Sequence, residues 1–211
     1  MSTYLTVASD GTAEIEVRRS RFIANVARVA TEEEARAVVD RVRRQHWDAR
    51  HNCSAFVLGP DASVMRSSDD GEPSGTAGAP MLEVLRGRGV SDVVAVVTRY
   101  FGGVLLGAGG LVRAYSDAVR AGLDAAGMLQ RRLMTLYDVE VDLAVAGKLE
   151  NDLRRRGVTV QGVDYARDAR LHLAARADEA STVRSVVSEV TAGASRVRAA
   201  GFAWVDVPLD H

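Results

Sequence analysis

Three acidic side chains lie within four residues of a glycine-rich segment. Asp69, Asp70 and Glu72 offer the hard carboxylate oxygens that divalent cations prefer, and paired carboxylates could also serve as general acid and base. Their spacing does not match the EF-hand loop, and a solvated acidic loop accounts for the same residues. We keep the three acids as candidate ligand contacts and predict neither a metal ion nor a cofactor.

Two hydroxyl groups follow in the same segment. Ser74 and Thr76 could act as nucleophiles, but neither lies in the G-x-S-x-G turn that exposes a catalytic serine. Loop hydroxyls more often bond to the backbone of a turn. A hydrolase that uses the 69–76 loop with Arg99 and Arg113 is therefore an alternative hypothesis, and a non-catalytic role is the main one.

Two glycine-rich segments, residues 71–78 and 102–110, flank a strongly apolar run. Glycine is needed where the backbone takes a positive φ or approaches another group closely. The second group of glycines opens a predicted helix, whose free N–H groups and positive dipole end could bind a phosphate or carboxylate. The candidate anion-binding residues are Arg99, Tyr100, Gly102, Gly103, Gly107, Gly109, Gly110 and Arg113. Alternatively, the glycines only permit tight turns and close packing, and the arginines pair with the acids of the loop.

Several well-known motifs do not occur in the sequence. No G-x-G-x-x-G or G-x-x-x-x-G-K-[ST] string is present, which disfavours dinucleotide and ATP binding. The H-x-E and P-C-x-x-C pattern of zinc deaminases is missing too. Cys53 is the only cysteine, so no intramolecular disulfide forms. We expect Cys53 to be buried and His51 to be hydrogen-bonded rather than bound to zinc.

Charge and hydropathy limit the classes of partner. The 211 residues carry a formal net charge of −1, and residues 133–211 hold ten basic and twelve acidic side chains. Because no global field attracts a polyanion, RNA binding would need a local site, and we expect no reader of DNA sequence. No stretch approaches the roughly 18 apolar residues of a membrane helix, and the first residues lack a secretory signal pattern. We therefore expect a cytoplasmic protein that does not bind membranes.

Hydrophobic periodicity predicts a hairpin followed by a helix at the start of the chain. Residues 12–18 and 22–29 form the two predicted strands. Thr31 with Glu34 makes a capping box, and apolar residues at helical spacing follow until the helix ends near His46.

A continuous β-branched run, residues 93–97, predicts a strand that is buried on both faces at the centre of a sheet. This strand lies between the two glycine-rich segments and would position both. The other elements predicted around it are strands at 52–58 and 63–66, a helix that begins at Pro80 and a helix that Gly127 ends. Together these elements predict an α+β domain.

The last part of the chain follows the order β-α-β-β-α-β, which is that of a ferredoxin-like domain. We place the boundary at Arg131-Arg132, which gives domains of residues 1–132 and 133–211. The predicted elements are 135–141, 145–156, 158–165, 169–175, 178–191 and 196–207.

Longer strings in the first domain resemble a known family. The strings are residues 68–78, 97–103 and 110–115, with shorter matches at 20–24 and 51–53. On these strings the sequence resembles the IMPACT family of small two-domain proteins, of the YigZ type.

The resemblance implies a fold and a class of function. It implies an N-terminal domain similar to ribosomal protein S5 domain 2 and a C-terminal ferredoxin-like domain similar to the last domain of elongation factor G. Both occur in translation machinery, and eukaryotic members damp a translational-control kinase by competing for its activator. We therefore expect a non-catalytic binding or regulatory protein whose partner is RNA, the ribosome or a translation-associated protein. A protein-interaction module without nucleic-acid binding is the third hypothesis.

Overall fold

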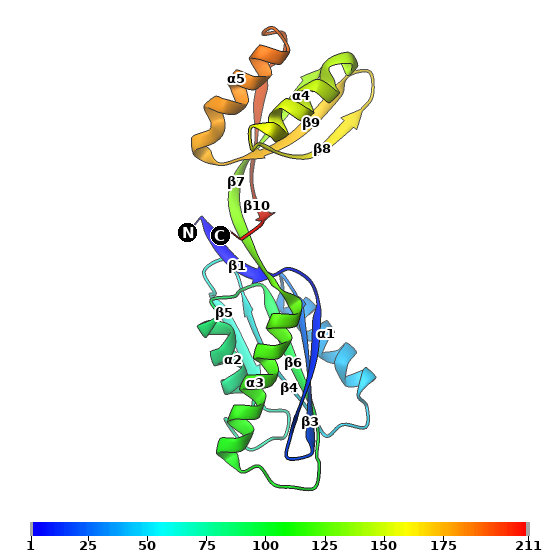
Figure 1. The fold of residues 1–211 in the computed structure, drawn as a ribbon, viewed down its shortest axis with the longest axis vertical. Coiled ribbons are helices and arrows are strands. Elements are labelled where there is room, and N and C mark those ends of the chain that lie inside the picture. The colour runs from blue at the N-terminus through cyan, green and yellow to red at the C-terminus, as the bar shows by residue number, and fades with distance from the viewer. Residues whose placement is uncertain (1, 210–211) are drawn as a thin grey trace. The chain divides into compact units, whose positions relative to one another are not determined.

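The structure, a computed structural model, describes residues 2–209 and separates into two compact units. The first unit ends at Arg131 and also contains the described residues from Val207 on, and the second spans Arg132–Asp206 (Figure 1). Each unit has its own hydrophobic core. The predicted fold class, an α+β chain with an S5 domain 2-like domain followed by a ferredoxin-like domain, is confirmed.

The sheet of the first unit has five antiparallel strands in the order β2-β3-β6-β4-β5. β6 is central and buried on both faces, as predicted, because Val93 and Val97 face one core while Val94 and Val96 face another. The strands of this unit are β1 (Thr3–Val7), β2 (Gly11–Val17), β3 (Ser20–Arg28), β4 (His51–Leu58), β5 (Val64–Ser68) and β6 (Val93–Tyr100).

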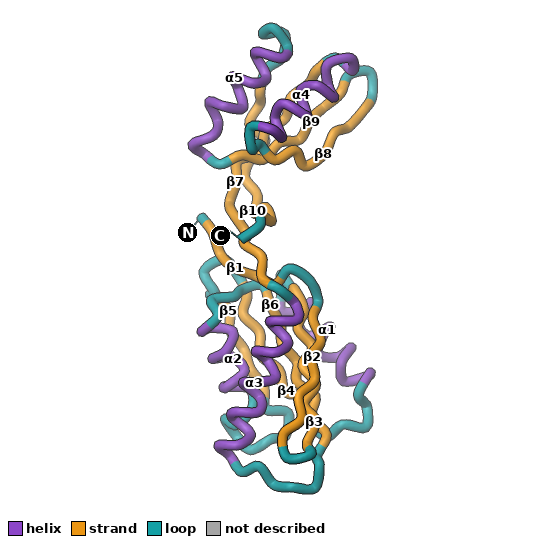
Figure 2. The backbone as a smooth tube through the Cα atoms, in the orientation of Figure 1, coloured by secondary structure: helices purple, strands orange, loops and turns teal. Residues whose placement is uncertain are grey.

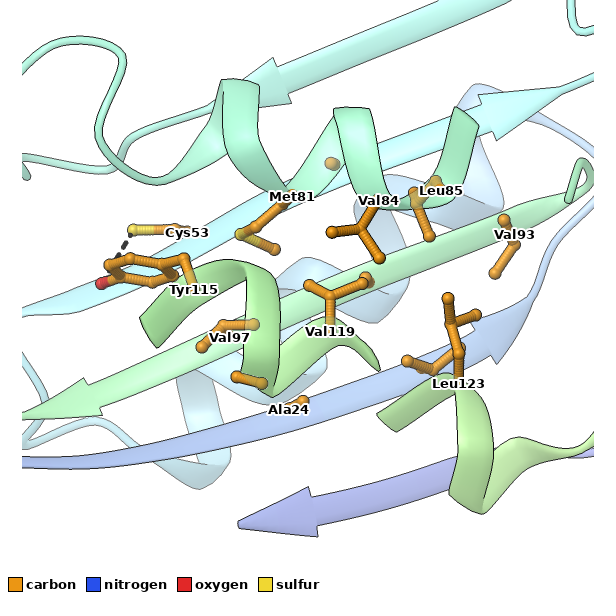
Figure 3. Packing of buried hydrophobic residues seen from close by; sticks show 14 of the residues in the cluster. Ala24, Cys53, Met81, Val84, Leu85, Val93, Val97, Tyr115, Val119 and Leu123 are labelled. Atoms are coloured by element: carbon orange, nitrogen blue, oxygen red, sulfur yellow. Dashed lines mark hydrogen bonds between the residues drawn. The ribbon is translucent and has the colours of Figure 1, made fainter. Parts of the chain in front are cut away.

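Helices cover both faces of this sheet. α2 (Gly78–Gly87) and α3 (Ala108–Ala126) lie on one face, and α1 (Glu32–Gln45) lies on the other (Figures 1 and 2). Figure 3 shows Met81 and Leu85 of α2 packed with Tyr115 and Leu123 of α3 over the strands. Full burial of each such side chain stabilises the fold by roughly 1.5–3 kcal/mol, so this interface holds the two helices that follow the glycine-rich loops.

The start of α1 shows why its sequence signal was reliable. The Thr31 hydroxyl accepts a hydrogen bond from the Glu34 N–H at 3.2 Å, as the capping box predicted. The Glu34 carboxylate reaches back to the Ala30 N–H at 2.6 Å. Ala35 and Val42 are buried beneath the helix, which ends at His46.

One element was not predicted, and several element boundaries differ from the predictions. β1 was not predicted, and it joins the rest of the unit through a parallel bridge between Leu5 and Val90. α2 begins at Gly78, ahead of Pro80, because a loop carboxylate caps its first amides. The strand predicted from residue 135 begins at Met128, directly after Gly127 ends α3.

In the second unit, the strand order is β10-β7-β9-β8, with β7, β9 and β8 pairing antiparallel. The helices pack on this sheet through Leu149, Leu153, Val183 and Val187, which are all buried. The elements are β7 (Met128–Val141), α4 (Leu143–Arg155), β8 (Thr159–Tyr165), β9 (Ala169–Ala175), a 3-10 turn (Ala177–Glu179), α5 (Ala180–Val190) and β10 (Val197–Val207). Among the described residues, no helix is both long and apolar enough to cross a membrane.

Candidate functional site

The strand register brings the candidate residues of the first unit to one end of its sheet. Tyr100 at the end of β6 pairs with Arg21, and Arg99 pairs with His51 at the start of β4. The loop 101–107 therefore lies beside the turn between β2 and β3 (Figure 2). The loop 69–77 meets the same end through contacts with β4.

The Asp69 carboxylate organises the acidic loop. It accepts hydrogen bonds from the N–H groups of Gly75 at 2.8 Å, Ala77 at 3.1 Å and Gly78 at 2.8 Å. Burial raises the pKa of Asp69, but the three N–H groups outweigh burial and hold the pKa below its ordinary value. Asp69 thus caps α2 and folds the loop, so its oxygens are already used.

Asp70 ties the same loop to its neighbours. Its backbone takes a positive φ of 42°. Its carboxylate accepts from the Asn52 N–H at 2.7 Å and from the Arg43 guanidinium at 2.6 Å. Its carbonyl oxygen lies 2.9 Å from His51 Nδ1, and because a carbonyl only accepts, Nδ1 must carry the proton. Asp70 therefore links the loop to α1 and β4.

Glu72 is the buried member of the acidic group. Its Oε1 accepts from Arg99 Nη1 and from the Tyr115 hydroxyl, both at 2.8 Å. The side chains of Glu72 and Arg99 are only 3% and 9% exposed. Removal of one partner from such a buried pair costs about 3–5 kcal/mol, because the other charge is left without compensation. Glu72 and Arg99 therefore anchor the loop to the central strand.

Cys53 completes this buried network and is protected from ionisation. Its sulfur lies 3.3 Å from the Tyr115 hydroxyl, a contact drawn in Figure 3, and 2.9 Å from the Asp69 carbonyl. Burial raises the pKa of Cys53 to about 12, and burial also raises the pKa of Tyr115. The thiol stays protonated at neutral pH and is a poor nucleophile.

The loop hydroxyls have different surroundings. Thr76 is buried and donates to the Pro73 carbonyl at 2.7 Å, which is the turn-forming role expected of a loop hydroxyl. Ser74 is exposed and makes no hydrogen bond to the described residues.

The structure places the two candidate arginines in different pockets. Arg113 is exposed and lines a pocket of about 250 Å³ at the start of α3, together with Gly110 and Arg18. Arg99 and Tyr100 line another pocket of about 460 Å³. The acids of the 69–77 loop border neither pocket, so the loop and Arg113 do not share a cleft.

Gly102, Gly103 and Gly107 have clear structural uses. A Cβ on Gly102 would lie 2.0 Å from the backbone of Arg19, and the Gly102 N–H donates to the Ser20 hydroxyl at 3.1 Å. Gly103 and Gly107 both take positive φ, and Gly107 caps α3. Gly109, in the first turn of α3, has open space where its side chain would be. Gly102 lets the loop lie close to the β2–β3 turn, and anion binding by the candidate glycines stays a prediction.

The pocket beside Arg99 also contains residues that sequence reasoning did not select. Phe101 is 57% exposed and Leu105 is 81% exposed. Arg50 is exposed and makes no ion pair or hydrogen bond with the described residues. The lining residues are Asp48, Ala49, Arg50, His51, Arg99, Tyr100, Phe101 and Leu105. An aromatic residue placed directly before Gly102-Gly103, where the buried strand ends, is the signal that could have identified Phe101.

Tyr100 organises the wall of this pocket. Its hydroxyl donates to Asp48 at 2.9 Å and lies 3.0 Å from His46 Nδ1. Because the single hydroxyl proton goes to Asp48, His46 Nδ1 must donate to the Tyr100 oxygen. The Arg21 guanidinium lies 5.5 Å from the Tyr100 ring centroid.

Exposed arginines surround the loop 101–107. Arg18 donates to the Leu105 carbonyl at 3.3 Å, and the backbone of Arg19 lies against Gly102. Arg50 lines the pocket that contains Phe101 and Leu105, and Arg113 lines the pocket that contains Leu106. We call this region, residues 101–107 with Arg18, Arg19, Arg50 and Arg113, the loop surface. It combines positive charge with exposed apolar side chains.

The fold and this site define a two-domain α+β protein whose first domain carries an arginine-rich loop surface beside a buried ion-pair network. No cluster of three or more metal-ligating side chains occurs among residues 2–209. A family model described as the Impact N-terminal domain matches residues 18–123. A second, described as a domain of unknown function (DUF1949), matches residues 139–194. The chain belongs to the IMPACT family, as the sequence strings predicted.

Relatives cover both units. The chain is 40% identical to the IMPACT family member YvyE of Bacillus subtilis over 211 residues, which cover all of this chain and 97% of the relative. It is 44% identical to the IMPACT family member YigZ of Escherichia coli over 67% of this chain and 71% of the relative. A crystal structure described as a hypothetical protein superposes with a TM-score of 0.62 at 37% identity, over 93% of this chain and 97% of that one.

Proposed function

We propose that this protein is a non-catalytic binding protein linked to translation, and that its loop surface contacts RNA. The observation that supports this most directly is the set of exposed arginines around the exposed side chains of Phe101 and Leu105. Arginines neutralise phosphates, and aromatic rings stack on unpaired bases. The partner would be RNA itself, the ribosome or a translation-associated protein, in the cytoplasm.

The state of the acidic loop supports a non-catalytic role. The carboxylates of all three acids already accept hydrogen bonds within the protein. Asp69 accepts from backbone amides, Asp70 from a backbone amide and Arg43, and Glu72 from Arg99. A general base needs an oxygen within reach of a substrate proton. The 69–76 loop with Arg99 and Arg113 therefore gives the hydrolase hypothesis little geometric support.

The link to translation rests on the two fold types. Folds of the S5 domain 2 and ferredoxin-like types, both present here, occur in proteins of the translation machinery. Because a fold does not imply a function, this likeness only selects which partners to test first.

The test is to titrate fluorescently labelled, short single-stranded RNA with the protein and to measure binding by fluorescence anisotropy. The titration is repeated at several salt concentrations. We expect the logarithm of the affinity to fall linearly with the logarithm of salt, with a slope of about −0.7 for each phosphate contacted. Arg113→Ala should make this slope shallower by about 0.7. The control is Arg155→Ala, which removes an exposed arginine from α4 in the second unit and should leave the slope unchanged.

Two results would contradict the proposal. RNA binding that is absent, or that does not respond to salt, rules out a phosphate-based contact. If RNA binding is absent and affinity capture recovers a protein partner without RNA, the protein-interaction hypothesis replaces the proposal of RNA binding. Turnover of a small molecule that Asp70→Ala abolishes without loss of folding would instead establish the hydrolase hypothesis.

A further inference from the structure

The Arg99 guanidinium has donors that the loop contacts leave unused. Nη1 is bonded to Glu72, whereas Nε is buried without a hydrogen-bond partner among residues 2–209. Nη2 makes no hydrogen bond to the described residues either, and it is not among the fully buried atoms without partners. Arg99 is one of the residues that line the pocket, although its side chain is only 9% exposed. Nε and Nη2 form one edge of the planar guanidinium, the kind of edge that binds two oxygens of a phosphate or carboxylate.

The other residues of the pocket limit the chemical class of its ligand. Arg50 supplies a second positive charge without a partner among the described residues, and Phe101 supplies an exposed aromatic ring. Asp48 contributes a carboxylate, which repels a bare anion but accepts hydrogen bonds from hydroxyl or amino groups. The matching ligand combines an anionic group, a flat apolar face and several hydrogen-bond donors. A nucleotide has all three.

We infer that this pocket binds one unpaired nucleotide, with its phosphate on Arg99 and Arg50 and its base against Phe101. The inference rests on the proposed function and assigns one subsite within the loop surface. A volume of about 460 Å³ lies within the usual range of roughly 300–1,000 Å³ for small-molecule sites. Bases in a duplex are stacked inside the helix and cannot enter such a pocket, so the subsite selects single strands.

The first experiment uses the full chain with adenosine 5′-monophosphate, adenosine and inorganic phosphate as separate probes. We expect the monophosphate to shift the backbone amide resonances of residues 48–51 and 99–105 in NMR spectra. Adenosine and inorganic phosphate should each bind at least about tenfold more weakly, because each lacks one of the two main contacts.

Matched variants separate the pocket from the rest of the loop surface. Arg50→Ala and Phe101→Ala change exposed side chains, so both variants should fold, and each should weaken binding of the monophosphate by about tenfold. Arg113→Ala should weaken RNA binding yet leave binding of the monophosphate unchanged, because Arg113 lines the other pocket. Phe202→Ala removes an exposed aromatic ring from β10 in the second unit and is the control for Phe101.

The outcomes distinguish the inference from the proposed function. If single-stranded and duplex RNA bind equally well and the monophosphate shifts no resonance of the pocket, the subsite is wrong while RNA binding stands. If the monophosphate binds in the pocket but no RNA binds, the proposed function is wrong while the pocket stands. Equal binding of inorganic phosphate and the monophosphate would overturn the assignment of a nucleotide.

Discussion

At the scale of single residues, neighbours decide what each acid does. Asp69 is surrounded by backbone amides, Asp70 by an arginine and an amide, and Glu72 by a buried arginine and a tyrosine. The three side chains are chemically almost identical and lie within four residues. Their roles nevertheless differ, because a carboxylate takes its role from the donors that the fold brings to it.

Asp69→Asn should lower the free energy of unfolding by about 2 kcal/mol at pH 7, since hydrogen bonds to charged groups contribute roughly 1.5–3 kcal/mol. Chemical denaturation with urea measures the difference. Asp40→Asn is the control, because Asp40 is exposed on α1 and makes no hydrogen bond to the described residues. An equal loss in both variants would show that Asp69 does not organise the loop.

The difference in stability between the wild type and Asp69→Asn should depend on pH. Folding lowers the pKa of Asp69 below the ordinary value of 3.8. Its contribution to stability is therefore complete above that value and is lost as pH falls through the lower pKa of the folded state. The difference between wild type and Asp69→Asn should shrink below pH 3.8 and disappear in stronger acid. A difference that stays constant there would contradict this assignment.

At the scale of elements, close backbone approach shapes the loop surface. The loop 101–107 lies against the turn between β2 and β3 at Gly102, where no other residue fits without movement. The Arg18 side chain, from the same turn, donates to the Leu105 carbonyl of the loop. The exposed positions of Phe101 and Leu105 therefore depend on this contact between a loop and a turn.

Gly102→Ala should destabilise the protein by about 1–3 kcal/mol, the usual cost of forcing extra atoms into a packed site. It should also change the amide resonances of residues 101–107. Gly109→Ala is the matched control, because open space surrounds that position in the first turn of α3. Alanine there should be neutral or stabilise the helix by about 0.5 kcal/mol. Similar denaturation curves for the two variants would show that the close approach at Gly102 is not required.

At the scale of the whole molecule, each unit is held by its own buried apolar clusters, two in the first unit and one in the second. Leu85 is buried in the first unit, and Leu149 is buried in the second. Each unit therefore has apolar contacts of its own that stabilise it. Stability measured by one global probe would average over both units.

Leu149→Ala should destabilise the second unit by about 2–5 kcal/mol, the usual result of removing a buried leucine. Hydrogen exchange should become faster in α4, β8 and β9 and stay unchanged in β6. Leu85→Ala should produce the reverse pattern. Faster exchange in both units after either substitution would show that the two units unfold together.

Local signals in the sequence were enough to predict most elements. The capping box at Thr31, the β-branched run of β6 and the βαββαβ order depend on residues near one another in the chain, and the structure agrees with each. β1 was not predicted, because it is short and because its bridge partner, Val90, lies far along the chain. Local periodicity carries no information about such a distant partner.

The sequence by itself determined the fold class and the family. Only the tertiary structure decided that Glu72 meets Arg99 and Tyr115, that Asp69 caps α2, and that Arg99 and Arg113 open into different pockets. The physical reason is that secondary structure follows from spacing along the chain, whereas a binding site depends on strand register. The pairing of His51 with Arg99, set by packing of the whole sheet, places Arg50 and Phe101 at one pocket.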